Sequence, residues 1–285
     1  MSSADINDYS SRCVGTVNTA EHRVFVSYNG HVVSTLHDVP LLPNPNDSNE
    51  NTELILNMIV EAPRWTNAQM TIAPGEAFAP VRQAVRRNRR LAYVRNTFPH
   101  RGYIWNYGAL PQTWSEGAPL HACELGERIA QVGDVRRVRV LGLLAPRDEG
   151  VLRWTLLVVD IADPLATRLH NIADVERECP GLISATKEWL RLYKVAAGKA
   201  ENTLDGEVEG LDFTRNILQA AHKAWRNIVT ASVSSALVDL TNITISNSPG
   251  HVPGGDEELH KNLKGTREEA QIPSSTSKWW YLGTS

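Results

Sequence analysis

Residue types that carry chemistry are present in this chain, but few of them stand at spacings that form a site on their own. The three cysteines, Cys13, Cys123 and Cys179, lie far apart and form no CxxC pair. This spacing is typical neither of a zinc site nor of a disulfide framework, and it favours a reducing compartment. Two arginine-rich runs, Arg86–Arg90 and Arg136–Arg139, are typical of solvated surfaces, although the first would also attract an anionic partner.

Charge and composition exclude several classes of protein. The 285 residues carry a formal net charge of −3, with 29 Lys and Arg against 32 Asp and Glu. This balance excludes a broad nucleic-acid-binding surface but not a local basic pocket. No run approaches the ~18 apolar residues of a transmembrane helix, and the N-terminus lacks the basic start and apolar core of a secretory signal. We therefore expect a cytoplasmic protein without a membrane or nucleic-acid partner.

The elements that must position any reactive side chains are mostly strands. Two alternating runs, 22–28 and 31–36, flank Asn29-Gly30, which is a strong hairpin signal. Further strand-like runs lie at 54–61, 69–72, 91–95, 136–144 and 151–161, and helical periodicity is found at 183–193 and 211–229, where it puts Phe213 on the apolar side. This order predicts an α+β, mainly β, fold: a small closed β-barrel with helices packed outside.

The chain is expected to form one barrel domain with a short extension at each end. Residues 1–20 are polar and predict an N-terminal arm, and residues 21–245 hold the strand and helix patterns of the barrel domain. Residues 246–285, rich in Pro, Gly, Ser and charge, predict a C-terminal tail. The turn-rich stretch at 43–53 predicts an exposed loop, which is a candidate cover for a cavity.

Three segments carry a family resemblance. They are MIVEAPRWTNA at 58–68, FPHRGYIWNYGALPQTW at 98–114, and DIADPLA at 160–166 with EWLRLYK at 188–194. With them the chain resembles the soluble inorganic pyrophosphatases of the eukaryotic type, from about residue 21 to residue 229. The resemblance implies a small OB-like barrel that is commonly a homodimer. It also implies that pyrophosphate is hydrolysed with the help of several Mg²⁺ ions. Carboxylates hold these ions, and the ions generate a hydroxide nucleophile from water.

Most acids of the family site are replaced in this sequence. The family motif of three aspartates around a proline aligns with 116–121, so that Ala118 stands for the base and His121 for a metal ligand. Further replacements are Gln69 for Lys, Thr71 for Glu, Ala92 for Arg, Trp105 for His, Arg153 for Asp and Thr155 for Lys, whereas Glu61, Tyr103, Tyr107, Asp148, Tyr193 and Lys194 are retained. We therefore expect no metal cofactor, a pair between Arg153 and Asp148, and no efficient pyrophosphate hydrolysis.

The replacements lead to the hypothesis of a reassigned cavity: a metal-independent isomerase, cyclase or lyase for a small organic substrate in specialised metabolism. His121 is the predicted general acid/base, oriented by Asp148 or Glu61, and Tyr103 is a hydroxyl donor to an oxyanion. The predicted substrate-binding residues are Arg153, Lys194, Tyr193, Tyr107, Trp105, Thr155, Gln69, Thr71, Ala92 and Ala118, and no metal-binding residue is predicted.

Two alternatives stay open at this stage. One is a residual Mg²⁺-dependent inorganic pyrophosphatase, which would require Asp148. The other is a non-catalytic binding or dimerisation module, whose partner would contact exposed residues such as Arg86–Arg90.

Overall fold

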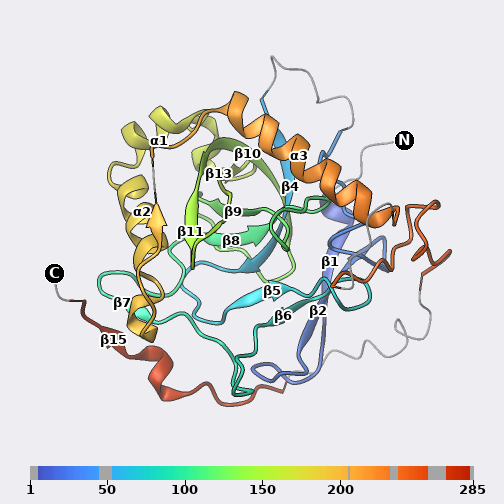
Figure 1. The fold of residues 1–285 in the computed structure, drawn as a ribbon, viewed down its shortest axis with the longest axis horizontal. Helices are drawn as coiled ribbons and strands as arrows, with labels where there is room; N and C mark the ends of the chain where they lie inside the picture. The colour runs from blue at the N-terminus through green and yellow to red at the C-terminus, as the bar shows by residue number, and fades with distance from the viewer. Residues whose placement is uncertain (1–5, 45–52, 205, 232–236, 256–267, 283–285) are drawn as a thin grey trace.

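A closed barrel forms the centre of the protein. The computed structural model describes residues 6–44, 53–204, 206–231, 237–255 and 268–282. The barrel strands follow the order β10-β13-β9-β8-β4 (Figure 1), and all neighbours are antiparallel except β13 and β9. Their bounds are β4 (Ile55–Ala62), β8 (Asn106–Ala109), β9 (His121–Glu124), β10 (Val135–Leu144) and β13 (Thr155–Asp160). The predicted α+β, mainly β, barrel is confirmed.

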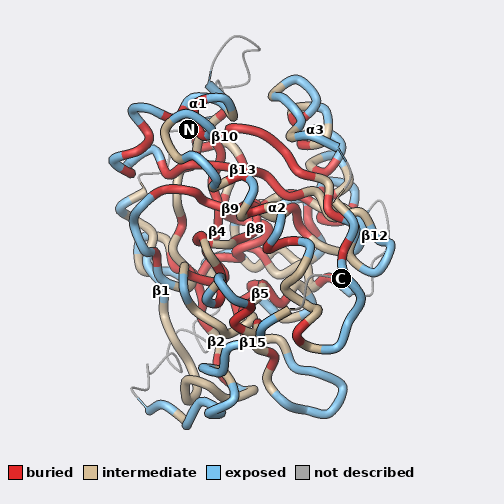
Figure 2. Tube along the Cα trace, turned by 90° about the vertical axis from the view of Figure 1, so that its left-hand side faces the viewer, coloured by how far each residue is buried: buried red, intermediate tan, exposed pale blue. Residues whose placement is uncertain are grey.

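Strand β13 shows why the barrel strands are apolar without interruption. Its residues Leu156 and Val158 join one hydrophobic cluster, and Leu157 and Val159 join another. Successive side chains of a strand point to opposite faces, so both faces of β13 are buried. The tube in Figure 2 accordingly shows the centre of the molecule as buried.

A second sheet packs beside the barrel in the order β1-β2-β6-β5, with β3 paired to β2. Its strands are β1 (Tyr9–Val14), β2 (Arg23–Tyr28), β3 (His31–Val33), β5 (Met70–Ile72) and β6 (Val81–Gln83). The predicted hairpin is confirmed, because Tyr28 pairs with His31 and the turn residues Asn29 and Gly30 have φ values of 50° and 82°. The predicted arm at 1–20 differs: from residue 9 it forms β1, which is antiparallel to β2.

Three helices pack outside the barrel (Figure 1): α1 (Ile172–Glu178), α2 (Leu182–Leu192) and α3 (Leu211–Val229). Helix α3 buries Leu218, Ala221 and Trp225. Phe213, expected on the apolar side, is 41% exposed and packs edge-on against Trp154 at 5.6 Å between ring centroids. No described helix is both long and apolar enough to cross a bilayer. Short 3₁₀ helices occupy Ile6–Asp8, Pro164–Thr167, Val195–Ala197 and Ser274–Ser277.

Short strands complete the fold around the barrel mouth. They are β7 (Asn96–Thr97), β11 (Pro146–Asp148), β12 (Val151–Leu152), β14 (Thr203–Leu204) and β15 (Trp279–Trp280). The predicted strand at 151–161 divides at residues 153–154 into β12 and β13, and the run at 91–95 forms only isolated bridges. Within the predicted tail, β15 pairs in parallel with β7. Most of the predicted loop at 43–53 lies outside the described residues.

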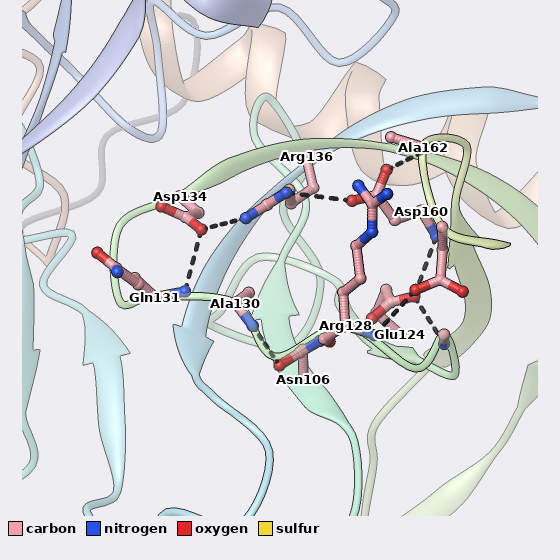
Figure 3. A network of polar contacts seen from close by, with 11 residues as sticks. Asn106, Glu124, Arg128, Ala130, Gln131, Asp134, Arg136, Asp160 and Ala162 are labelled. Carbon is pink, nitrogen blue, oxygen red and sulfur yellow. Dashed lines mark hydrogen bonds and ion pairs between the residues drawn. The ribbon is translucent and has the colours of Figure 1, made fainter.

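A buried polar network ties four barrel strands together (Figure 3). The carboxylate of Glu124 accepts hydrogen bonds from Asn106 Nδ2 at 2.7 Å and from the backbone N of Gly126 and Asp160 at 2.7 and 3.0 Å. Arg136 joins Asp160 at 3.4 Å and Asp134 at 2.5 Å. These residues come from β8, β9, β13 and β10 or from the adjoining loops, so one network fixes their register.

Candidate active site

A cavity of about 280 Å³ lies where β4, β9, β11 and β13 meet the end of α2. Among the predicted site residues, those that line it are Glu61, Gln69, Thr71, Tyr103, Tyr107, Ala118, His121, Asp148, Arg153, Thr155 and Tyr193. The sequence analysis missed Met70, Ala84, Pro146, Leu190 and Asn202 in the lining. No motif pointed to Asn202, whose side chain donates to the carbonyl oxygen of Leu190 at 2.9 Å.

Glu61 and His121 are neighbours in the cavity wall. The structure puts His121 Nε2 3.5 Å from Glu61 Oε2. Glu61 Oε1 accepts from the backbone N of Ile72 at 2.7 Å, whereas Oε2 is buried and has no hydrogen-bond partner among the described residues. The imidazole is also stacked on Tyr107, with ring centroids 5.2 Å apart and 11° between the planes. Glu61, rather than Asp148, is therefore the carboxylate next to His121.

Burial changes the protonation of this pair. It raises the pKa of Glu61 from 4.5 to about 7, because ionisation in a site with 1% exposure loses most of its hydration. Burial, with a smaller effect from the nearby charge of Arg153, lowers the pKa of His121 from 6.5 to about 4. At neutral pH, His121 is therefore neutral and Glu61 is divided between its two forms.

Asp148 belongs to a different cluster of charges. Lys194 Nζ donates a hydrogen bond to its Oδ1, and Tyr193 Oη lies 3.4 Å from its Oδ2. Arg153 instead donates to the backbone oxygen of Glu116 at 2.9 Å. The predicted pair of Arg153 with Asp148 is therefore wrong, since the β11–β12 hairpin turns Asp148 toward the end of α2.

The retained tyrosines form the wall beneath these charges. Tyr103 and Tyr107 stack with centroids 5.6 Å apart, and burial raises the pKa of each hydroxyl well above 10. Burial and the charge of Asp148 also raise the pKa of Tyr193. The three hydroxyls consequently stay protonated across the physiological range and are hydrogen-bond donors.

Four residues discussed from the sequence do not line the cavity. Lys194 lies outside the lining, although its Nζ pairs with the lining residue Asp148. Trp105 is fully buried, and its indole N–H donates to Thr186 Oγ1 of α2 at 3.0 Å, so it belongs to the core beneath the site. Ala92 is buried outside the lining. Glu116 is exposed in a tight turn with a φ of 48° and also lies outside the lining.

Comparison with known proteins decides the family. The family model described as inorganic pyrophosphatase matches residues 58–226. The inorganic pyrophosphatase of Candida albicans is 40% identical over 97% of this chain and 99% of its own length, and that of Neurospora crassa is 39% identical over 97% and 98%. The solved inorganic pyrophosphatase of Schistosoma japonicum superposes with a TM-score of 0.84 at 34% identity, covering 96% of this chain and 100% of the other. This chain belongs to the inorganic pyrophosphatase family.

Membership of the pyrophosphatase family corrects four predictions. The expectation of no efficient pyrophosphate hydrolysis and the reassignment to an isomerase, cyclase or lyase are both wrong, because relatives aligned over nearly the whole chain are named inorganic pyrophosphatases. The small organic substrate predicted with it has no support. The expected absence of a cofactor is likewise overturned, since pyrophosphatases of this family work with Mg²⁺.

The described side chains at the cavity nevertheless do not fit a cluster of several Mg²⁺ ions. Such a cluster needs many carboxylate oxygens, and the lining supplies two carboxylates. Asp148 is already neutralised by Lys194, so that only Glu61 Oε2 lacks a partner. In the part of the chain that the structure describes, no three His, Cys, Asp or Glu residues come together as a metal-binding group. The chemistry assigned below therefore rests on the protein's own side chains.

Proposed function

We propose that the chain hydrolyses inorganic pyrophosphate to two phosphates, and that the substrate binds in the cavity at the barrel mouth. The observation that carries this proposal is the 40% identity, across nearly the entire length of both chains, to an enzyme named inorganic pyrophosphatase. The alternative of a residual pyrophosphatase, left open by the sequence, is thus preferred.

Arg153 and Lys194 are the cations that would bind the phosphate oxygens. The guanidinium group of Arg153 is held by one hydrogen bond, to the backbone oxygen of Glu116, and its remaining donors suit two oxygens of one phosphate group. Lys194 is a compact charge beside Tyr193, whose protonated hydroxyl adds a neutral donor. Thr155, Gln69 and Thr71 add polar groups to the lining.

His121 and Glu61 are the groups suited to move a proton. The pKa of Glu61, about 7, lies near neutral pH, so its carboxylate form is the stronger base of the pair, whereas the low pKa of His121 keeps the imidazole neutral. When water attacks one phosphorus, the bond to the bridging oxygen breaks, the departing phosphate keeps that oxygen, and the proton of the water passes to Glu61. The neutral imidazole of His121, 3.5 Å from Glu61 Oε2, would position the water or relay its proton.

The proposal is tested by phosphate release from pyrophosphate across a Mg²⁺ titration, with the Candida albicans enzyme as the positive control. We expect phosphate release by this protein, and the titration shows how far it depends on Mg²⁺. Lys194→Met should lower kcat/KM about 10²-fold, because a positioned charge at the phosphate is lost. The matched control Lys199→Met removes an exposed lysine that pairs with Glu149 outside the cavity lining, and it should leave the rate unchanged. A folded protein that releases no phosphate at any Mg²⁺ concentration would contradict the proposal.

We also propose that the protein is a homodimer, as the family resemblance implies. An exposed aromatic surface supports this: Phe98, Trp279 and Tyr281 are 60%, 38% and 75% exposed, and the ring of Phe98 lies 6.1 and 5.6 Å from the other two. Light scattering after gel filtration should show a dimer that Phe98→Glu dissociates. Ile129→Glu, at an apolar residue with 56% exposure, is the matched control. A cytoplasmic location stays a prediction.

A further inference from the structure

A second cavity, larger than the candidate active site, lies between the arginine turn at 86–90 and the C-terminal segment 271–280. Its volume is about 530 Å³, within the range of small-molecule sites. The two cavities adjoin the same stretch of chain after β6, because Ala84 lines the first and Arg86 lines the second. None of the proposed catalytic residues lines the second cavity.

The charge of this cavity is strongly positive. Arg86, Arg90 and Arg95 line it, and its described lining residues include no Asp or Glu, although the chain as a whole carries a net charge of −3. Arg95 is held in place, since its guanidinium group lies 4.3 Å from the ring centroid of Trp280 and donates to the backbone oxygen of Ala196. Most of the remaining lining is polar and uncharged.

The turn itself forces two of these charges together. The backbone N of Arg86 donates to the oxygen of Arg90 at 2.8 Å, and that of Arg89 donates to the oxygen of Arg86 at 2.9 Å. Arg86 and Arg90 are therefore opposite each other, and like charges in this position are destabilising. Arg86 Nη2 donates to the backbone oxygen of Tyr93 at 3.3 Å, and the described lining supplies no carboxylate to either guanidinium group. A bound anion would remove this repulsion.

Two unsatisfied donors point to the same conclusion. Tyr93 Oη and Trp280 Nε1 are buried without a hydrogen-bond partner among the described residues, and both side chains belong to the cavity wall. A buried donor without a partner destabilises the fold, because it has lost its hydration without gaining a hydrogen bond. A ligand rich in acceptor oxygens would offer such partners after a small adjustment of the wall.

We propose that this second cavity binds a small molecule that carries a multiply charged phosphate chain, either a nucleoside polyphosphate or a short inorganic polyphosphate. The guanidinium groups of Arg86 and Arg90 bind the phosphate oxygens, for which planar forked donors are well suited. Arg95 with Trp280 forms the rigid back of the site.

Calorimetric titration of the purified protein tests the proposal, with ATP and inorganic tripolyphosphate as separate probes in Mg²⁺-free buffer. The test variant is Arg86→Ala/Arg90→Ala. The matched control is Arg87→Ala/Arg89→Ala, which removes the same charge from the same turn at residues that do not line the cavity. We expect the Kd of at least one probe to rise tenfold or more in the test variant and less than threefold in the control.

The two probes distinguish the sources of the phosphate chain: preference for ATP indicates a nucleotide and preference for tripolyphosphate an inorganic chain. Equal weakening in both double variants would mean diffuse attraction by the turn and would overturn the proposal. So would binding that neither variant changes, because the probe would then occupy another site. Arg86→Lys/Arg90→Lys keeps the charge and guards against misfolding. It should still raise Kd severalfold, since lysine lacks the forked donor, and an unchanged Kd in this variant would count against the assigned contacts.

Discussion

Replacing Glu61 by Gln should make the protein more stable at alkaline pH and leave its stability nearly unchanged at pH 4, below both pKa values of this carboxyl. The carboxylate is buried with one oxygen unpartnered, and its pKa rises from 4.5 in the unfolded chain to about 7 in the fold. The native state therefore binds more protons than the unfolded state between these pH values, and the contribution of Glu61 to stability falls as pH rises through this range. One pKa unit corresponds to about 1.36 kcal/mol, so the ionised carboxylate costs about 3 kcal/mol at pH 8.

The assay is urea unfolding of both proteins at pH 4, 5, 6, 7 and 8. Glutamine resembles the protonated acid, so the variant should match wild type at pH 4 and exceed its free energy of unfolding by an amount that grows with pH, up to about 3 kcal/mol at pH 8. His121 contributes in the opposite direction, because its lowered pKa makes the free energy of unfolding rise with pH between pH 4 and 6.5. Both proteins contain His121, so the difference between their free energies of unfolding reports on Glu61. The exposed Glu127→Gln is the control and should give a flat difference. A wild type more stable than Glu61→Gln at pH 8 would refute the reasoning, because the ionised carboxylate would then have a cationic partner.

Three further substitutions test the core and the site. Trp105→His, which restores the residue type of the family, should lower the free energy of unfolding by about 2–4 kcal/mol in urea, because a fully buried ring that packs on α2 is truncated; an unchanged midpoint would contradict this packing. Glu124→Gln can keep a carbonyl oxygen for the two backbone donors but then places its amide N–H₂ opposite Asn106 Nδ2, and it should cost about 1–3 kcal/mol in the same assay; a stability equal to wild type would show that the network in Figure 3 is dispensable. Asp148→Asn keeps the shape but removes the partner of Lys194, and it should weaken the protein by about 1 kcal/mol or less because the pair is partly exposed; a larger loss would mean a more buried pair.

The sequence predicted the elements best where local pattern alone decides the structure. The bounds of α3 were correct, and the hairpin at Asn29-Gly30 followed from the need for two positive φ values. The buried face of α3 was predicted less accurately. It includes the polar residue Thr214, which a search for apolar residues at helical spacing does not find. The strands β8 and β9 were not predicted, because they are short and their pairing with β4 and β13 depends on contacts far apart in sequence.

The candidate site was predicted residue by residue but not as a set of contacts. Most of the predicted site residues line the cavity, because aligning the motifs identifies which positions of the chain belong to the site. The partners of Asp148 and His121 depend on how the β11–β12 hairpin and the end of α2 approach each other, which no motif encodes. The activity was mispredicted for a different reason: replaced ligands show what a site lacks, but they do not identify another substrate.

The contacts between the two ends of the chain affect when the protein can finish folding during synthesis. Val17 and the segment at 268–270 exchange backbone hydrogen bonds of 2.9 Å, and β15 pairs with β7 more than half of the chain earlier. These partners are synthesised later, so the emerging polypeptide holds residues 17 and 96–97 without their native neighbours until residues 268–280 have left the ribosome. The barrel strands can assemble earlier, but the edges closed by the C-terminal segment stay open to chaperones during that interval.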